Sequence, residues 1–155
     1  MKKRIVLGAD HAGYLLKNEM AKRLAEAGYP VENVGTDSGE SCDYPVYAEK
    51  ACRAIQEGRA DLAILICGTG VGMSLAANKM KGIRAACCSD VYSTEFTRLH
   101  NDANVLCMGA RVIGEGLAWI LTQTFVETEF EDADRPDGKH ARRIGLIAAL
   151  EEKEK

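Results

Sequence analysis

The sequence lacks the cysteine spacing of a zinc site or of a small disulfide framework, although it contains six cysteines. No two of them form a C-x-x-C pair, and most lie within apolar runs, which argues against both kinds of site and favours a reducing compartment. No apolar run approaches the length of a membrane span. The opening Met-Lys-Lys-Arg leads into an apolar stretch, residues 5–7, that is too short for a signal peptide. We therefore expect a cytoplasmic protein with no membrane partner.

An excess of basic charge is also lacking, because the net charge is -3 and the isoelectric point is about 5.7. This balance gives no indication of a nucleic-acid or membrane-surface partner. Apolar residues make up 46% of the 155 positions and charged residues 28%, an ordinary globular mixture. A chain of this length can bury a core of its own, so we expect a single domain over residues 1–155.

Short apolar runs alternate along the chain with amphipathic stretches. Strands are predicted at 5–9, 31–34, 61–67, 83–88 and 105–108, and helices at 14–27, 45–57, 72–80, 91–99 and 115–128. This order predicts an α/β fold with one five-stranded parallel sheet and helices on both faces, although it leaves the strand order open. An acidic loop at 127–139 then precedes a last helix at about 140–152, which can pack on its own domain or reach a partner subunit.

Polar and glycine residues follow several of the predicted strands, at the edge of a parallel sheet where ligands bind. Asp10 and His11 follow the first strand, and Arg111 follows the fifth. Cys67 ends the third strand and begins a loop, 68–72, in which three glycines alternate. Alternating glycines allow backbone N–H groups to converge on an anion, such as a phosphate or an oxyanion formed during a reaction. The alternative is a tight strand-to-helix turn without a ligand.

A dinucleotide site is a second interpretation of the glycine loop. Gly68, Gly70 and Gly72 do not match G-x-G-x-x-G, because the third glycine comes one position early. The loop also follows the third strand, whereas the turn after the first strand carries Asp10 and His11 instead of glycines. These departures weigh against a nucleotide ligand.

Cys67 and the histidines are the candidate acid–base groups. A cysteine before a helix N-terminus has its thiolate favoured, although a buried cysteine is more often a small apolar side chain. His11 and His100 lie on or near the polar edge, and His140 opens the last helix; each has the alternative of a surface or capping role. Arg111 is a candidate phosphate clamp. Arg142 and Arg143 are also candidate phosphate clamps, with a solvated helix face as the alternative. The other cysteines are interpreted as structural: Cys42, Cys52, Cys87, Cys88 and Cys107.

Six short motifs in order carry a resemblance to a known family. They are Gly-Ala-Asp-His-Ala-Gly at 8–13, Asp-Tyr-Pro at 43–45, Ile-Cys-Gly-Thr-Gly-Val-Gly at 66–72, Ala-Ala-Asn-Lys at 76–79, Gly-Ile-Arg-Ala at 82–85 and His-Asn-Asp-Ala-Asn-Val-Leu at 100–106. Together they resemble the type B ribose-5-phosphate isomerases, of the family that includes allose-6-phosphate and galactose-6-phosphate isomerases. The resemblance covers residues 4 to about 150. It implies a Rossmann-like α/β/α sandwich and a homodimer or tetramer with the site near the subunit interface.

The resemblance also implies roles for individual residues. Cys67 corresponds to the base that moves a proton between C1 and C2 of the sugar, His100 to the group that helps to open the furanose ring, and Thr69 lies in the catalytic loop. The expected substrate-binding residues are Asp10, His11, Tyr44, Gly68, Gly70, Val71, Gly72, Asn101, Arg111, Lys139 and Arg143. Isomerisation through an enediolate needs a base and oxyanion donors, but neither a metal nor an organic cofactor.

One departure from the family pattern bears on the substrate. The family reads Gly-Arg-His before its last helix, whereas this chain has Lys139 between Gly138 and His140. Lysine keeps the positive charge but lacks the bidentate fork that grips a phosphate. The expected activity is therefore the interconversion of ribose 5-phosphate and ribulose 5-phosphate, with allose 6-phosphate, galactose 6-phosphate or a tetrose phosphate as alternative substrates. A nucleotide- or sugar-phosphate-binding module without turnover is the alternative from another class.

Overall fold

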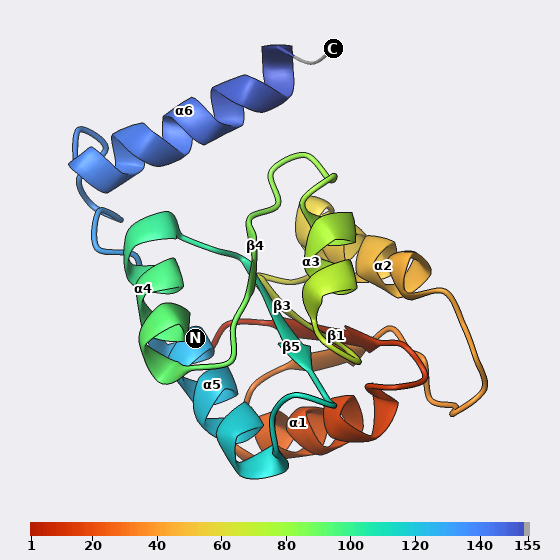
Figure 1. Cartoon of the computed structure of the whole chain (residues 1–155). Coiled ribbons are helices and arrows are strands. Elements are labelled where there is room, and N and C mark those ends of the chain that lie inside the picture. Colours follow the sequence, from red (N-terminus) through yellow and green to blue (C-terminus); the bar gives the residue numbers. More distant parts are fainter. Residues whose placement is uncertain (154–155) are drawn as a thin grey trace.

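The alternation of strands and helices is confirmed in the computed structural model, which describes residues 1–153 (Figure 1). Its strands are β1 (Ile5–Ala9), β2 (Val31–Asn33), β3 (Leu62–Cys67), β4 (Ala85–Cys87) and β5 (Val105–Gly109). The helices of this part of the chain are α1 (Tyr14–Glu26), α2 (Tyr44–Gln56), α3 (Val71–Ala77), α4 (Val91–Asn101), α5 (Glu115–Glu127) and α6 (Lys139–Lys153).

The five strands form one parallel sheet in the order β2-β1-β3-β5-β4. The central strand β3 pairs with β1 on one side and β5 on the other, and all of its residues are buried. A strand covered on both faces has no solvent side, so its sequence is apolar throughout instead of alternating. This explains the unbroken apolar run Leu-Ala-Ile-Leu-Ile at 62–66.

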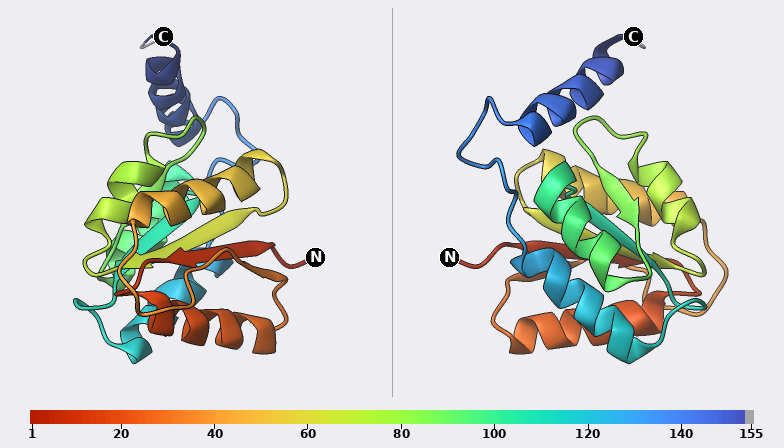
Figure 2. Two further views of the ribbon diagram at one scale, coloured as in Figure 1. Left: turned by 90° about the vertical axis from the view of Figure 1, so that its right-hand side faces the viewer. Right: turned by 60° about the vertical axis from the view of Figure 1, so that its left-hand side comes forward.

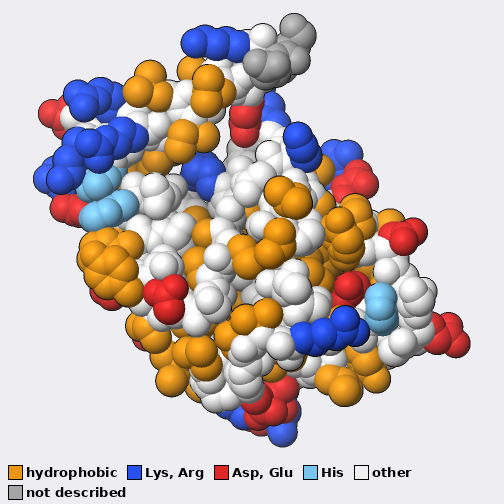
Figure 3. Space-filling model, viewed as in Figure 1, with side chains coloured by type: hydrophobic (Ala, Val, Ile, Leu, Met, Phe, Trp, Pro, Cys, Tyr) orange, Lys and Arg blue, Asp and Glu red, His pale blue; other side chains and the backbone are white. Residues whose placement is uncertain are grey.

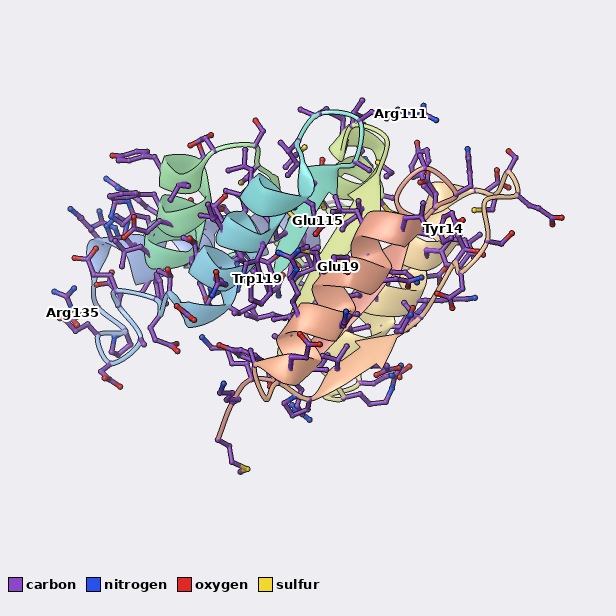
Figure 4. The ribbon with its side chains drawn as sticks, turned by 90° about the horizontal axis from the view of Figure 1, so that it is seen from below. Tyr14, Glu19, Arg111, Glu115, Trp119 and Arg135 are labelled. Atoms are coloured by element: carbon purple, nitrogen blue, oxygen red, sulfur yellow. The ribbon has the colours of Figure 1, made fainter. Side chains whose placement is uncertain are left out.

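Successive side chains of β3 point into two separate cores, one on each face of the sheet. Ile64 and Ile66 pack in one core with side chains of α1 and α5. Ala63 and Leu65 pack in the other core with side chains of α2 and α3. Figure 2 shows these layers on either side of the sheet, and Figure 4 shows α1 and α5 next to each other on one face. The helices thus form the three-layer arrangement expected from the sequence.

Helix α6 projects beyond the three layers, next to α4 (Figures 1 and 2). Its exposed side chains include Leu146, Ile147 and Leu150. The carboxylate of Asp132, in the loop before the helix, accepts the N–H groups of His140 and Ala141 at 2.8 and 3.2 Å. Asp132 therefore caps the first turn of α6 and attaches it to the preceding loop.

Two predicted boundaries are wrong in the stretch between β3 and β5. The helix expected over 72–80 ends at Ala77, and the strand expected over 83–88 is limited to Ala85–Cys87. The side-chain amide of Asn78 donates to Ala85 O at 2.9 Å and accepts from Ala85 N at 2.8 Å. These bonds replace the next turn of helix with a side-chain link to the strand.

Among residues 1–153, no helix combines the length and the apolar character that crossing a membrane requires.

Candidate active site

Three turns meet at the carboxyl ends of β1, β3 and β5. After β1 and β5 the chain continues into helices on one face of the sheet, and after β3 it continues into α3 on the other face. In parallel sheets a ligand-binding crevice is expected at such a change of direction, at the ends of the strands. Backbone hydrogen bonds connect the turns, from Asp10 N to Ile66 O at 3.2 Å, from Ala110 N to Cys67 O at 2.9 Å and from Arg111 N to Gly68 O at 3.0 Å.

Cys67 lies at the centre of this crevice, as the last residue of β3. It is 5% exposed, and its Sγ accepts the backbone N–H of Gly70 at 3.1 Å. The same loop leads directly into α3, which begins at Val71. The contact fixes the direction of the sulfur relative to the loop of backbone donors. The geometry suits a sulfur that acts as a base.

The glycines allow this loop to pack closely against its neighbours. Gly70 has a φ of +81°, in the left-handed region that side chains with a Cβ avoid. A Cβ on Gly72 would lie 2.7 Å from Cζ of Tyr44, so the tyrosine ring rests on the backbone at the start of α3. The structure thus brings Tyr44 against the glycine loop, next to Cys67.

Asp10 and His11, which follow β1, reach the same crevice. Asp10 is 6% exposed, and its Oδ1 accepts the N–H groups of Ala12 and Gly13 at 2.9 and 3.2 Å. His11 Nδ1 accepts the backbone N–H of Cys42 at 3.2 Å. The neutral ring of His11 then carries its proton on Nε2, because Nδ1 serves as the acceptor. His11 therefore offers an N–H donor to a ligand.

Arg111 brings positive charge to this edge from the turn after β5. Its Nη1 lies 3.6 Å from the position that a Cβ on Gly68 would occupy. The side chain is exposed and points away from the body in Figure 4. The carboxyl edge of one chain therefore collects a sulfur, a carboxylate, an imidazole and a guanidinium around a loop of backbone donors.

His100 and Asn101 do not reach this edge in the same chain. Helix α4 starts after the carboxyl end of β4 and runs back, so its last turn lies at the amino ends of the strands. The backbone carbonyl of Asn104, three residues beyond α4, accepts the N–H of Ala63, near the start of β3, at 2.9 Å. The expectation that His100 lies on or near the polar edge is therefore not met within one chain. Figure 3 likewise shows histidine side chains in two separate places, beneath the start of α6 and across the molecule from it.

A second group of the expected site residues lines a pocket between α4 and α6. His100, Asn101 and Arg143 share this pocket with His140, and the rings of His100 and His140 stack with centroids 4.0 Å apart. Lys139, at the first position of α6, is exposed beside them. In Figure 3 positive side chains gather over the start of α6.

No functional role was predicted for two acidic residues beside this pocket, Glu131 and Asp132. Glu131 Oε2 lies 3.4 Å from His100 Nε2 and 3.5 Å from His140 Nε2. Asp132, which caps α6, also forms an ion pair with Arg135, in which Oδ1 of Asp132 lies 2.7 Å from Nη2 of Arg135. In the sequence, the one feature that pointed to these two residues was their position in an acidic loop close to His140. Solvated loops without a function have the same composition.

The pKa values of His140 and Asp132 are both lowered in the folded protein. Burial is the main cause that lowers the pKa of His140, with the charges of His100 and Lys139 acting in the same sense and Glu131 and Asp132 opposing it. The pKa of Asp132 is also lowered, because the N–H donors of Ala141 and His140 and the charge of Arg135 outweigh its burial, the largest single cause, which raises it. At neutral pH His140 is therefore a neutral imidazole above an ionised carboxylate.

The other cysteines differ from Cys67 in their surroundings. Burial raises the pKa of Cys52 to about 12 and that of Cys107 well above its ordinary value. Burial also raises the pKa of Cys87 and of Cys88. These four thiols stay protonated and do not compete for the role of base. All six cysteines, each within the described residues, are unpaired in this structure.

Comparison with known proteins gives a consistent result. The family model described as Ribose/Galactose Isomerase matches residues 5–147. Ribose-5-phosphate isomerase B of Escherichia coli K12 is 44% identical over 151 residues, covering 97% of this chain and 98% of that protein. D-erythrulose-4-phosphate isomerase 2 of Mycolicibacterium smegmatis is 41% identical over 151 residues, covering 96% and 97%. The solved structure of Clostridium thermocellum ribose-5-phosphate isomerase B superposes with a TM-score of 0.93 at 45% identity, covering 98% of this chain and 99% of the other.

Proposed function

The chain belongs to the ribose/galactose isomerase family, and we propose that it interconverts ribose 5-phosphate and ribulose 5-phosphate with Cys67 as the base. It is a sugar-phosphate aldose–ketose isomerase, as are its relatives. The observation that carries the assignment of the base is the position of Cys67 Sγ, which ends β3 and accepts the Gly70 N–H at 3.1 Å.

The reaction removes the proton on C2 of the open-chain aldose and delivers a proton to C1. The Cys67 thiolate takes the proton on C2, the electron pair of the broken C–H bond forms a C1=C2 double bond, and the π pair of the aldehyde moves to its oxygen, which gives an enediolate. In the loop 68–72 the N–H groups of Gly70 and Val71 are bound to Cys67 Sγ and to Thr69 Oγ1, the latter at 3.3 Å. The other backbone N–H groups of the loop and the Thr69 hydroxyl proton are the candidate donors to this oxyanion. The proton of the C2 hydroxyl passes to the oxygen on C1, a carbonyl forms at C2, and the electron pair of the double bond takes the proton from Cys67 to C1, which leaves Cys67 as a thiolate again.

The remaining groups at the carboxyl edge hold the two ends of the sugar. Asp10 uses Oδ1 for its own turn, so within the described residues its Oδ2 is available to a sugar hydroxyl. His11 offers its Nε2–H, and Arg111 offers its guanidinium, to a phosphate. Tyr44, packed on Gly72, forms one wall beside the reacting carbons.

We infer that His100, Asn101 and Arg143 complete the site from a second copy of this chain, in a homodimer. A closed furanose must open before C2 can lose its proton, and an imidazole suits this acid–base step. The carboxyl edge of one chain has Cys67 without His100, and the pocket between α4 and α6 has His100 without Cys67. Exposed apolar side chains support association, namely Val71 and Leu75 on α3 and Leu146, Ile147 and Leu150 on α6 (Figure 3).

The activity is tested with purified protein in deuterated water on ribose 5-phosphate, allose 6-phosphate, galactose 6-phosphate and a tetrose phosphate. We expect fastest turnover of ribose 5-phosphate and deuterium in its ketose product, because the proton passes through an exchangeable thiol. Cys67→Ser should remove nearly all turnover, whereas Cys52→Ala, which changes a buried cysteine of α2, should not. Faster turnover of another sugar phosphate would make that sugar the preferred substrate and would leave the proposed mechanism unchanged. A folded protein that turns over none of the four would leave only a binding role.

The shared site is tested by mixing two inactive variants, Cys67→Ala and His100→Ala. Random mixing places half of the chains in heterodimers, each with one intact site and one doubly defective site. We therefore expect recovery to roughly a quarter of the wild-type rate. A mixture that stays inactive after subunit exchange, which is followed by mass spectrometry of the intact dimers, would place both groups in one chain.

A further inference from the structure

Lys17, on α1, is a lysine whose side chain has no exposed surface. It is 0% exposed, although lysine is one of the residues that proteins least often bury completely. Its ammonium donates to Asn33 Oδ1 at 2.7 Å and to Asp37 Oδ1 at 2.8 Å. Burying a charge is unfavourable unless it is paired, and an apolar side chain of similar size is often at least as stable in such a place. Stability alone therefore gives no reason for a lysine at this position.

Both partners of Lys17 belong to the segment that leaves the edge strand β2. Asn33 is the last residue of β2, and its Oδ1 also accepts the Gly35 N–H at 2.9 Å. Asp37 lies four residues beyond β2, and its side chain is 63% exposed. The hydrogen bond from Lys17 is the largest cause that lowers the pKa of Asp37, so this carboxylate stays ionised at neutral pH. Lys17 thus connects the buried side of α1 with the beginning of an exposed loop, residues 37–43.

The loop 37–43 contacts the start of α1 at two further points. A Cβ on Gly39 would lie 3.6 Å from Cε1 of Tyr14, so the loop rests against the tyrosine ring in the first turn of α1 (Figure 4). The backbone N–H of Cys42 donates to His11 Nδ1 at 3.2 Å. His11, Tyr14 and Lys17 are spaced by three residues, and in a helix this spacing places side chains next to each other. One row of side chains therefore holds the loop along its length, and His11 of the candidate active site is the last of the row.

Helix α1 is a fixed support for this loop. A Cβ on Gly13, the N-cap of α1, would lie 2.4 Å from Ile66 O, so the helix begins directly against β3. The loop itself contains no helix or strand, and all of its residues except Cys42 are exposed. Asp43, the N-cap of α2, makes no side-chain hydrogen bond to that helix. The position of the Cys42 N–H therefore depends on how the loop is held to α1.

We propose that Lys17 is a positioning residue of the active site, which acts through the loop 37–43 on the ring of His11. While Asp37 is held, the Cys42 N–H stays on His11 Nδ1, and the ring presents its Nε2–H to a ligand. A hydrogen bond to the second nitrogen of a functional histidine fixes both its tautomer and its direction. Without the ion pair the loop is released, and the ring loses its fixed direction. The effect on the substrate rests on the proposed function, in which His11 binds the phosphate, whereas the effect on the ring does not.

Four variants separate this role from a purely structural one. Lys17→Met replaces the ammonium with an apolar side chain of similar size, and Asp37→Ala removes the same ion pair from its exposed end. Asp37→Asn keeps an acceptor oxygen for Lys17. Lys22→Met removes an exposed lysine of the same helix and is the matched control. Circular dichroism establishes that each variant is folded, and Asp37→Ala provides the test if Lys17→Met does not fold.

The ring of His11 is observed directly by NMR of protein labelled with [15N]histidine, at about pH 8, where an ordinary imidazole is neutral. The spectrum of His11→Gln assigns the signals, because the chain has only two other histidines. We expect the wild type, Asp37→Asn and Lys22→Met to carry the proton on Nε2 and to show the Nδ1 signal of a hydrogen-bond acceptor. In Lys17→Met and Asp37→Ala the Nδ1 signal should move toward that of a free imidazole. An unchanged signal in the folded variants, or the same movement in Lys22→Met, would overturn the inference.

Steady-state kinetics test the consequence for the substrate. The Michaelis constant for ribose 5-phosphate should rise by about 3- to 10-fold in Lys17→Met and Asp37→Ala, as expected for the loss of one hydrogen bond, with little change in kcat. A purely structural role would lower the free energy of unfolding and leave the Michaelis constant of the folded protein unchanged, which would contradict the proposal. A protein without isomerase activity would refute the proposed function, and the NMR comparison would still decide whether Lys17 positions His11.

Discussion

Gly70→Ala perturbs the loop on which the proposed chemistry depends, and the structure separates its two effects on stability. The first is conformational, since φ is +81° and an alanine there is strained by about 1–2 kcal/mol. The second is steric, because the new Cβ would lie 2.9 Å from Cys87 Sγ and 2.9 Å from the carbonyl carbon of Met108. Overpacking of this kind typically destabilises by about 1–3 kcal/mol.

Gly58→Ala is the matched control for the conformational effect alone. Gly58 has a φ of +71°, and no atom lies within 4 Å of its Cβ position. We expect Gly58→Ala to lower the free energy of unfolding by about 1–2 kcal/mol and Gly70→Ala by about 2–5 kcal/mol, both measured by urea denaturation. A domain with a stability near the middle of the ordinary range, about 10 kcal/mol, remains folded with either change.

The same pair separates stability from catalysis. Gly70→Ala displaces the N–H that bonds to Cys67 Sγ and moves the neighbouring donors, so we expect kcat to fall by about 100- to 1,000-fold, the loss that follows removal of one oxyanion donor. Gly58→Ala should retain the wild-type kcat at a temperature where it is folded. Equal destabilisation by the two variants would refute the close packing of the loop. A wild-type kcat in Gly70→Ala would refute its role as the oxyanion cradle.

Three further predictions concern the start of α6. Asp132→Ala removes the acceptor of two helix N–H groups, so the free energy of unfolding in urea should fall by about 1–2 kcal/mol, whereas no change would show that the cap is not needed. Because the pKa of His140 is lowered in the folded state, the unfolded chain binds more protons below about pH 6.5, and stability should fall as the pH drops through this range. His140→Gln should flatten this dependence in urea titrations between about pH 7.5 and 5.5, and an unchanged slope would assign it to other groups. Lys139→Arg should lower the Michaelis constant by up to about tenfold, or ~1.4 kcal/mol, if the side chain holds phosphate, and an unchanged constant would mean that it points elsewhere.

The architecture could be predicted from local patterns because β1, β3 and β5 are short apolar runs and amphipathic helices separate the strands. The strand order could not, since β4 and β5 are both apolar and the sequence does not show that β5 lies between β3 and β4. The ends of α3 and β4 were misplaced because they depend on the side chain of Asn78, which bonds to Ala85 across the turn. Periodicity does not report such contacts.

The predicted site residues divide according to how they are positioned. Asp10, Cys67 and Arg111 follow strands, so the rule that ligands bind at carboxyl ends of parallel strands locates them together. His100 lies in the last turn of α4, which returns to the opposite edge, and the rule does not apply to it. Glu131 lies in an acidic loop whose composition resembles that of any solvated loop, and only the packing of α6 brings it to the histidines.

The hydrogen bonds between the three turns have a consequence for how this fold changes over evolution. Cys67 is held by backbone atoms, through Ala110 N to its own carbonyl and Gly70 N to its sulfur. The groups expected to contact the sugar and its phosphate, such as His11 and Arg111, reach the crevice as side chains from neighbouring turns. Exchanging those side chains leaves the backbone bonds around the sulfur intact. Sugar selectivity can therefore diverge between lineages while the proton-transfer apparatus is inherited unchanged.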